Sequence, residues 1–425
     1  MLSLRYLSEN RDLVIKRLKV KNFQAAELVD RIMELDLQRR KIKNNLDNSQ
    51  AAANKLSKQI GKLFQTARKE EAQQAREKTI ALKEEIGQLI PELGETEKQL
   101  KEFLLQLPNI PHESVPEGKT PDNNQLIRDG GVIPELYPGA LPHWELARKY
   151  DIIDFELGNK VTGAGFPVYK GKGARLQRGL INFFLDEATK AGYTEIIPPI
   201  LVNEDSAFGT GQLPDKEGQM YHVQDDNFYL IPTAEVPLTN IYRREIIPFE
   251  DLPRKLTAYT PCFRREAGSY GKDVRGLNRL HQFDKVEIVE IQHPSRSYES
   301  LEAMTSYVES LVSRLQLPYR IVLLCGGDMS FHSAKTYDFE VFSGAQKKWL
   351  EVSSVSNFES FQSNRMMLRF REEVGKKTDI VHTLNGSALA LPRIMAALLE
   401  NNQSEKGIRI PSVLLPYTGF EVIDL

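Results

Sequence analysis

The sequence predicts an α+β protein in which an N-terminal antiparallel two-helix coiled-coil arm precedes a mixed, mostly antiparallel sheet flanked by helices. Apolar residues recur every seven positions through residues 28–107, whereas strand-like and helix-like segments follow one another without a regular βαβ order after residue 145. A proline-rich stretch separates the two patterns. We therefore expect an N-terminal domain at 1–107, a linker at 108–145 and a second domain at 146–425.

The arm is predicted from two heptad seams. Ten of the twelve heptad positions in residues 28–67 are apolar, and a second seam runs through residues 72–107. A reversal around residues 64–71 would let two such helices pair as an antiparallel hairpin about 50–60 Å long. Because proline removes a helical hydrogen bond, we expect Pro91 to kink or interrupt the second helix.

The two arm helices differ in charge. Residues 31–70 contain ten Lys/Arg and four Asp/Glu, net +6, whereas residues 71–107 contain five and eight, net −3. A solvated coiled coil explains such charges without any partner. The alternative is that the first helix lies along a phosphate backbone. The cations concerned are Arg39, Arg40, Lys41, Lys43, Lys55, Lys58 and Lys62.

The second domain alternates short strands with a few helices. Strand-like segments are predicted at 193–202, 228–233, 256–266, 281–291, 318–325, 335–342 and 348–357. Helical periodicity is found at 173–192, 297–315 and 388–402. This order favours a largely antiparallel sheet.

Composition excludes several classes of protein. The net charge of −2 gives no global basic field, so a nucleic-acid partner must be met by a local patch. The two cysteines and seven histidines form no zinc-ligand spacing, so we expect no zinc. No stretch reaches the roughly 18 apolar residues of a membrane span, and the N-terminus lacks the features of a signal peptide. We therefore expect a cytoplasmic protein with no membrane partner.

The segment FRREAGSYGKDVRGLNRLHQFDKVE carries the densest set of oriented charges. On a strand, Arg264 and Glu266 share one face and Arg265 points to the other. After a glycine-bearing loop, Phe283 and Glu287 share a face of a second strand. An arginine fork suits phosphate, an aromatic ring stacks on a purine and a carboxylate holds an ammonium group. These residues indicate a site for a nucleotide and an amine, although a surface hairpin with salt bridges is the better explanation of an isolated Arg-x-Glu.

Three further clusters follow the same logic. In KKWLEVSSVSN, Glu351 and the following hydroxyls could hold Mg²⁺ against phosphate, or they could form a polar edge strand. In HTLNGSALALPRIMAALLE, the residues from Asn385 are predicted to open a helix carrying Arg393, which could reach an anion or simply cap the helix. Pro392 argues for a kink or a later helix start. FYLIPTAEVPL could be a capped turn.

Together these motifs resemble those of the class II aminoacyl-tRNA synthetases, in the form typical of the seryl-tRNA synthetase family. YTPCFRREAGSYGKDVRGLNRLHQFDKVE resembles the second class II signature, GYTEIIPPILV the first and NGSALALPRIMAALLE the third. TAEVPLT, DMSFHSAKTYDFEV and LEVSSVSN are similar to seryl-type segments, and LDLQRRK and NKLSKQIGKL to the tRNA-binding arm. The resemblance covers essentially the whole chain and implies a class II synthetase-type sheet.

The resemblance also implies roles for individual residues. Arg264, Arg279 and Arg393 would be catalytic, gripping the phosphates of ATP and the reacting carboxylate. The serine pocket would contain Thr233, Ala234, Glu235, Glu287 and Ser387, with Glu287 holding the ammonium group. The ATP site would contain Arg264, Arg265, Glu266, Leu280, Phe283, Glu351, Val352, Ser353, Ser354 and Arg393. Glu351 and Ser354 would coordinate Mg²⁺.

The implied activity is that of a homodimeric ligase with tRNA(Ser), and also tRNA(Sec), bound through the arm. L-serine would react with ATP to give seryl-adenylate and pyrophosphate, and the seryl group would pass to the 3′ end of the tRNA. One alternative is a catalytically altered paralogue acting as an RNA-binding or regulatory module. Another is a ligase charging a carrier protein, which is expected to lack the arm.

Overall fold

The computed structural model describes residues 1–66, 68–266 and 275–425. Most of the loop expected at 267–276, and residue 67 in the expected arm reversal, lie outside the described residues. The chain divides into two compact units. The first comprises Met1–Lys19 and Phe23–Pro108, and the second comprises Val20–Asn22 and Asn109–Leu425.

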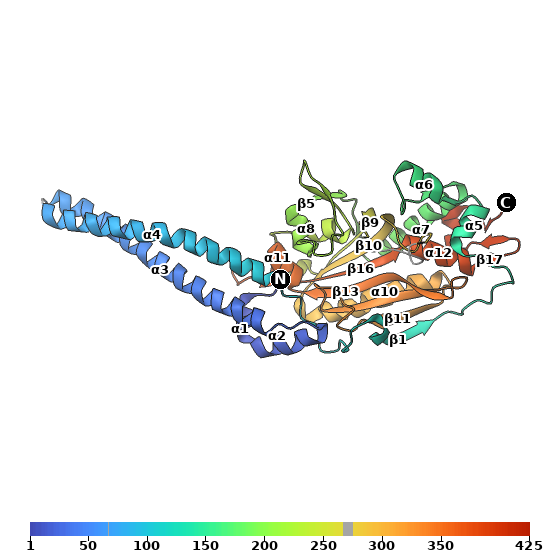
Figure 1. Cartoon of the computed structure of the whole chain (residues 1–425), viewed down its shortest axis with the longest axis horizontal. Helices are drawn as coiled ribbons and strands as arrows, with labels where there is room; N and C mark the ends of the chain where they lie inside the picture. Colours follow the sequence, from blue (N-terminus) through green and yellow to red (C-terminus); the bar gives the residue numbers. More distant parts are fainter. Residues whose placement is uncertain (67, 267–274) are drawn as a thin grey trace. The chain divides into compact units, whose positions relative to one another are not determined.

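The first unit is helical, and its two long helices confirm the predicted coiled-coil arm. α3 (Ala26–Gln65) and α4 (Lys69–Leu104) run side by side as a hairpin (Figure 1), preceded by α1 (Leu4–Glu9) and α2 (Arg11–Leu18). Seam residues of both helices are buried, among them Ile32, Leu35, Ile42, Leu46, Ala72, Ala75 and Leu100. At 1.5 Å per residue the 40-residue α3 is about 60 Å long.

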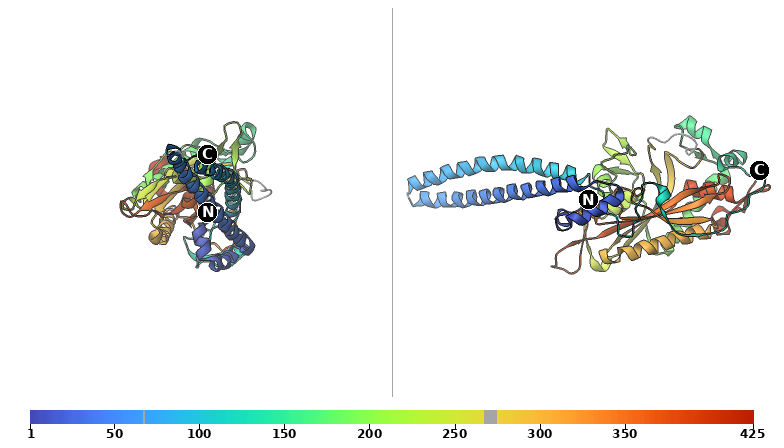
Figure 2. Two further views of the ribbon diagram at one scale, coloured as in Figure 1. Left: turned by 90° about the vertical axis from the view of Figure 1, so that its left-hand side faces the viewer. Right: turned by 60° about the horizontal axis from the view of Figure 1, so that its bottom comes forward.

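Pro91 was expected to kink or interrupt the second arm helix, and the expectation of an interruption is wrong. α4 continues through Pro91 without a break, and Figure 2 shows the two helices curving together. Pro91 and Gly87, whose carbonyl loses its helical partner, are both exposed, so water can reach that carbonyl.

The second unit is built on an eight-stranded sheet with the order β1-β11-β12-β13-β16-β10-β9-β4. Every neighbouring pair is antiparallel except β4 and β9, which confirms the predicted sheet. The strands are β1 (Gln125–Gly130), β4 (Thr194–Glu195), β9 (Arg254–Phe263), β10 (Gln282–Gln292), β11 (Tyr319–Leu323), β12 (Lys335–Ser343), β13 (Lys348–Glu359) and β16 (His382–Ala390). The linker thus supplies β1, an edge strand of this sheet (Figure 1).

Helices from different parts of the unit complete the core. Residues of α7 (Gly171–Lys190), α10 (Ser297–Arg314) and α12 (Leu391–Asn401) join the central strands in one apolar cluster. The shorter helices are α5 (His143–Lys149), α6 (Phe155–Val161), α8 (Glu204–Thr210), α9 (Glu235–Asn240), α11 (Phe361–Met366) and α13 (Leu415–Thr418). Small sheets use β2 (Ile153–Asp154) with β3 (Val168–Tyr169), β5 (Leu201–Asn203) with β6 (Tyr221–Val223) and β7 (Phe228–Leu230), β8 (Ile246–Pro248) with β14 (Arg369–Arg371) and β15 (Asp379–Ile380), and β17 (Gln403–Ser404) with β18 (Gly407–Arg409) and β19 (Val422–Ile423).

Strand alternation places polar side chains on one face of the central sheet. On β10, Val286 and Ile288 enter the apolar cluster, whereas Lys285 and Glu287 point to the other face and line a cavity. Such burial of charged residues is costly unless they are paired or serve a ligand. Packing of Val286 and Ile288 in the core therefore fixes the strand that carries Lys285 and Glu287 into the cavity.

The structure corrects the expected start of the last helix. The residues from Asn385 do not open a helix; they lie on β16, between β10 and β13, and α12 begins at Leu391 with Pro392 in its first turn. Pairing with two strands satisfies the backbone of Asn385–Ser387, and proline is tolerated in a first helical turn, where an N–H has no helical partner. The expectation of a later start is confirmed.

Candidate functional site

A cavity of about 640 Å³ lies on the polar face of the central sheet. The structure brings most of the predicted site residues together around it. These are Thr233, Glu235, Arg264, Glu266, Arg279, Leu280, Phe283, Glu287, Glu351, Val352, Ser353, Ser354, Ser387 and Arg393. Ala234 and Arg265 are not among the lining residues: Ala234 is fully buried, and the Arg265 backbone N–H donates to the Gln219 carbonyl at 2.9 Å.

The hairpin formed by β9 and β10 supplies many of these side chains. The expectation that Arg264 and Glu266 lie on a strand is wrong: β9 ends at Phe263, and both residues follow it. Glu266 has a positive φ of 49°, a turn conformation in which strand alternation no longer applies. Both side chains nevertheless line the cavity.

One end of the cavity is a buried cluster of Thr233, Lys285 and Glu287. The Thr233 hydroxyl donates to Glu287 Oε2 at 2.9 Å and accepts from Lys285 Nζ at 2.9 Å, and Lys285 also pairs with Glu287. Glu287 is 1% exposed and Lys285 6%. Ser387 lies opposite Glu287 on the neighbouring strand β16. This end therefore offers a fixed carboxylate flanked by hydroxyl groups.

A second carboxylate, Glu235, lies at the same end. Its backbone N–H donates to the Thr233 hydroxyl at 3.3 Å, and its Oε1 accepts from Gln362 Nε2 at 2.6 Å. Burial raises the pKa of Glu235 to about 7, and the negative charge of Glu287 adds to this shift. The hydrogen bond from Gln362 lowers the pKa but does not outweigh them. Glu287 is paired with Lys285, whereas Glu235 has no ion pair within the described residues, so the cluster favours the binding of one more cation.

The cavity is also lined by arginines. The Arg264 guanidinium lies 5.2 Å from the centre of the Phe283 ring, and Arg279 pairs with Glu266. A ring and planar forks of this kind suit a base and phosphate oxygens. The arrangement therefore has the chemistry of a nucleotide site.

Arg393 is fixed by two backbone carbonyls. Its Nε donates to the Asn278 carbonyl at 3.0 Å and its Nη1 donates to the Glu351 carbonyl at 2.6 Å, while Glu351 Oε2 lies 3.6 Å from Nη1. Its side chain is about a third exposed, so its charge is available to an anion in the cavity. α12 thus aims a positioned cation at the site from its first turn.

Hard oxygen ligands gather on β12 and β13. Glu351 and Ser354 line the cavity, and Asp338 lies opposite Ser354 in the strand pairing. Asp338 Oδ1 is buried without a hydrogen-bond partner in the described structure, and burial, together with the charge of Glu351, raises the pKa of Asp338 well above its usual value. A buried oxygen without a donor, beside a second carboxylate and a hydroxyl, fits a divalent cation such as Mg²⁺.

Reasoning from the sequence assigned no role to Lys285, Asp338 or Gln362. Lys285 was visible as the middle residue of the Phe283–Glu287 alternation, and Asp338 as part of the alternating TYDFEV segment. Gln362 gave no signal, because its contact with Glu235 joins residues 127 positions apart.

Two classes of feature are not found among the described residues. Over residues 1–66, 68–266 and 275–425, no three or more His, Cys, Asp or Glu side chains form a group that could hold a metal ion. In the same ranges no helix has the length and apolar character that crossing a bilayer requires. Cys262 and Cys325 are both buried and free.

The first arm helix presents a row of exposed cations. Arg39 and Arg40 pair with Asp36, with N–O distances of 2.7 and 2.5 Å. The remaining cations predicted there, Lys41, Lys43, Lys55, Lys58 and Lys62, are exposed and make no ion pair within the described part of the chain. These five lysines are referred to below as the α3 lysines.

Comparison with known proteins places this geometry in context. Residues 1–111 match the family model of the seryl-tRNA synthetase N-terminal domain, and residues 221–402 match that of the tRNA synthetase class II core domain (G, H, P, S and T). The chain is 53% identical to a serine–tRNA ligase of Salinibacter ruber over 96% of this chain and 95% of that one. It is 46% identical to that of Geobacter sulfurreducens over 99% of each.

Solved structures give the same result. The crystal structure of seryl-tRNA synthetase from Pyrococcus horikoshii complexed with ATP superposes with a TM-score of 0.93 at 35% identity, covering 100% of this chain and 99% of that one. The cytoplasmic serine–tRNA ligase from Naegleria fowleri in complex with AMP gives a TM-score of 0.86 at 25% identity, covering 98% and 96%.

Proposed function

The chain belongs to the seryl-tRNA synthetase family and is a ligase of that kind, and from this premise we propose that it joins L-serine to tRNA(Ser), and to tRNA(Sec), in two steps at the cavity. One observation supports this most strongly. Two buried carboxylates, Glu235 and Glu287, and three arginines, Arg264, Arg279 and Arg393, line the same cavity, so an amino acid and a nucleotide can be held against each other.

In the first step, the serine carboxylate attacks the α-phosphorus of ATP, and pyrophosphate leaves. Arg264 neutralises the α-phosphate and the attacking carboxylate, Arg279 orients them, and Phe283 stacks on the adenine. Glu266, Leu280, Val352 and Ser353 contact the rest of the nucleotide, while Arg393 holds the γ-phosphate. Positioning and charge neutralisation supply most of the rate, because this displacement needs no covalent help from the protein.

The carboxylate end selects the amino acid. Glu287 binds the ammonium group, and Thr233, Glu235 and Ser387 surround the short side chain, while Ala234 packs behind them without lining the cavity. A site that hydrogen-bonds a hydroxyl discriminates strongly against a substrate that lacks one, because its own buried polar groups would then lose their partner. Alanine is therefore rejected at the first step.

Glu351 and Ser354 would hold Mg²⁺, with Asp338 beside them. When bound, the ion supplies positive charge to the phosphates of ATP. The backbone carbonyl of Glu351 accepts a hydrogen bond from Arg393 and so anchors it. Ser353 Oγ donates to the Ser387 carbonyl at 2.6 Å, which joins β13, with its nucleotide-binding residues, to β16, with its serine-binding residue.

In the second step, the terminal adenosine hydroxyl of the tRNA attacks the carbonyl of seryl-adenylate, which forms the seryl ester, breaks the bond to the phosphate and releases AMP. We propose that the arm binds this tRNA. The α3 lysines are exposed and make no ion pair within the described part of the chain, and they lie on a 40-residue helix that is long enough to follow a phosphate backbone. Removing residues 31–100 and joining the ends through a Gly-Ser linker should abolish tRNA charging; unchanged charging would contradict this role. A homodimer and a cytoplasmic location are proposed from family membership alone.

Serine-dependent exchange of pyrophosphate into ATP tests the first step. We expect exchange with serine and none with alanine. Intact ATP binding without serine-dependent exchange would instead favour a catalytically altered paralogue.

A further inference from the structure

The described segment Arg275–Leu280 leads into β10 and carries four residues of the cavity wall, Leu277, Asn278, Arg279 and Leu280. The start of this segment is held by α5. The Arg275 guanidinium lies 4.8 Å from the centre of the Trp144 ring, and the Leu277 backbone N–H donates to His143 Nε2 at 2.8 Å.

Gly276 allows this close approach. It has a φ of +67°, and a Cβ at that position would lie 2.2 Å from His143 Nε2. The imidazole therefore packs against the backbone of the segment, and any larger residue at 276 would displace one from the other.

The hydrogen bonds of His143 fix its tautomer. Nε2 accepts from Leu277, so the ring proton is on Nδ1, which lies 2.7 Å from Glu400 Oε1. Both side chains are fully buried. The His143 ring thus links the Glu400 carboxylate to the Leu277 backbone N–H through two hydrogen bonds.

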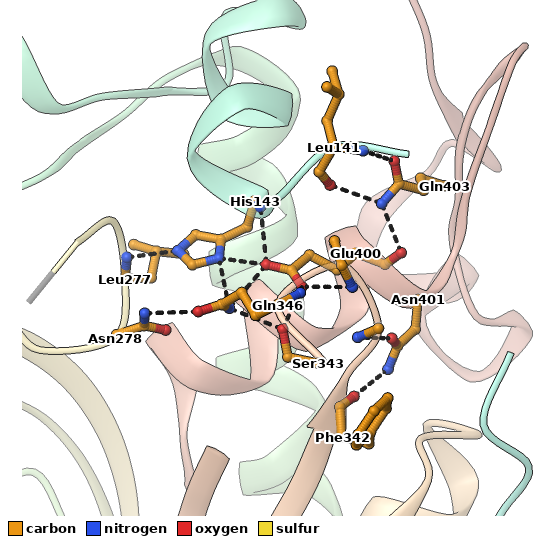
Figure 3. Close-up of polar contacts among 12 residues, drawn as sticks. Leu141, His143, Leu277, Asn278, Phe342, Ser343, Gln346, Glu400, Asn401 and Gln403 are labelled. Carbon is orange, nitrogen blue, oxygen red and sulfur yellow. Dashed lines mark hydrogen bonds and ion pairs between the residues drawn. The ribbon is translucent and has the colours of Figure 1, made fainter. Parts of the chain in front are cut away.

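Glu400 is in turn held by many donors (Figure 3). Its Oε1 accepts from the His143 backbone N–H and from Gln346 Nε2, both at 2.9 Å, and its Oε2 accepts from the Ser343 hydroxyl. Burial alone would raise the pKa of Glu400, but the hydrogen bonds from His143 and Ser343 outweigh it and lower the pKa below its usual value. Glu400 is therefore a fixed anion.

α12 holds the Arg275–Leu280 segment from both of its ends. Near its start, Arg393 donates to the Asn278 carbonyl at 3.0 Å. At its end, Glu400 acts through His143 on Leu277 and through Gln346, whose Oε1 accepts from Asn278 Nδ2 at 2.9 Å. A single rigid helix thus sets the distance between Arg393 and the backbone next to Arg279.

We propose that His143, Glu400 and Gln346 are positioning residues for ATP. They fix the Leu277–Arg279 backbone relative to Arg393, so that the triphosphate meets Arg279 and Arg393 together. This inference rests on the proposed function. It differs from a purely stabilising role, because it predicts a loss that is specific to ATP.

Three variants separate the two roles. His143→Asn keeps a donor at the position of Nδ1 but has no acceptor for Leu277, whereas His143→Gln can place its carbonyl oxygen where Nε2 lies. Gln403→Met is the matched control: Gln403 bridges the N–H and carbonyl of Leu141 at 2.7 and 2.8 Å beside the same network (Figure 3), away from the segment.

The experiment measures serine-dependent pyrophosphate exchange, with KM for ATP and for serine, and the melting temperature of each variant. We expect His143→Asn to lose about 10- to 100-fold in kcat/KM for ATP, with KM for serine within about twofold, and His143→Gln to recover most of it. Gln403→Met should lower only the melting temperature. If His143→Asn does not fold, Gln346→Leu, at a half-buried position, should show the same ATP-specific loss.

Two results overturn the inference. One is that His143→Asn or Gln346→Leu melts at a lower temperature but keeps the wild-type KM and kcat for ATP. The other is that the ATP loss is no larger than that of Gln403→Met. A wild-type protein without serine-dependent exchange would instead contradict the proposed function, so the two failures are distinguishable.

Discussion

At the scale of single residues, the site is organised by two buried carboxylates and one lysine. Lys285 pairs with Glu287, while Glu235 has an amide partner, Gln362, and no cation partner within the described residues. Burial therefore raises the pKa of Glu235 to about 7, near neutral pH. Burying a carboxylate without a cation is costly for the folded protein, and the ammonium group of an amino acid would offset that cost.

The stability of the ligand-free protein should depend on Glu235. Its folded pKa of about 7 exceeds the ordinary value of 4.5, so its favourable contribution is complete below pH 4.5 and is lost as pH rises through 7. Between pH 5 and pH 8, Glu235→Gln should remove about 2 to 3 kcal/mol of this pH dependence. Urea unfolding of both proteins at the two pH values measures it; parallel changes in the two proteins would contradict the assignment.

Replacing Lys285 with methionine should weaken serine binding, because Glu287 would lose the cation that holds it in place. The matched control is Lys255→Met, which removes the partner 3.0 Å from buried Glu290 on the same pair of strands. Both variants should destabilise the fold by about 3 kcal/mol. Only Lys285→Met should raise KM for serine in pyrophosphate exchange, by about tenfold or more. Equal effects on KM would show that Lys285 is merely structural.

At the scale of elements, the helices and strands that show a regular pattern of apolar residues were predicted correctly from that pattern. The heptads of α3 and α4 and the alternation along β9, β10, β12 and β13 appear in the structure close to the expected ranges. Predictions failed where tertiary partners decide. The residues around Gly386 look like a helix start in the sequence, but two neighbouring strands hold them extended, and α4 continues through Pro91 because its partner helix and solvent accommodate it.

The candidate site was predictable only in part for the same reason. Residues within motifs, such as Arg264 and Glu287, could be recognised from short spacings. Contacts across the chain could not, because no local pattern links Gln362 to Glu235 or Glu400 to His143, which are 257 residues apart. The expected loop at 267–276 lies mostly outside the described residues.

The proposed contribution of the α3 lysines to tRNA binding can be tested at this scale. Changing Lys55, Lys58 and Lys62 to Gln should leave pyrophosphate exchange unchanged and weaken tRNA binding. The slope of log K against log salt concentration should fall by about 2 to 3, one counterion per lost phosphate contact. The control changes Lys78, Lys83 and Lys98, three exposed lysines of the net-acidic α4. A slope that is unaltered, or altered equally by both triples, would exclude a backbone contact along α3.

At the scale of the whole molecule, the two units divide the proposed work. The helical unit has its own buried seam, and the sheet unit has its own core and the complete cavity. The sheet unit extends beyond residues 221–402 that match the class II core, and the added part contains α5, whose His143 contacts the cavity wall segment. On the proposed function, activation of serine needs the sheet unit, and transfer to tRNA needs both units.

The charging of tRNA with labelled serine by the intact chain, beside Glu287→Ala, tests the central claim most directly. We predict that label passes from serine to the 3′ end of tRNA(Ser) in the wild-type protein, that alanine and threonine are not transferred, and that Glu287→Ala loses the activity while retaining ATP binding. Transfer of another amino acid in preference to serine, or undiminished charging by Glu287→Ala, would contradict the account.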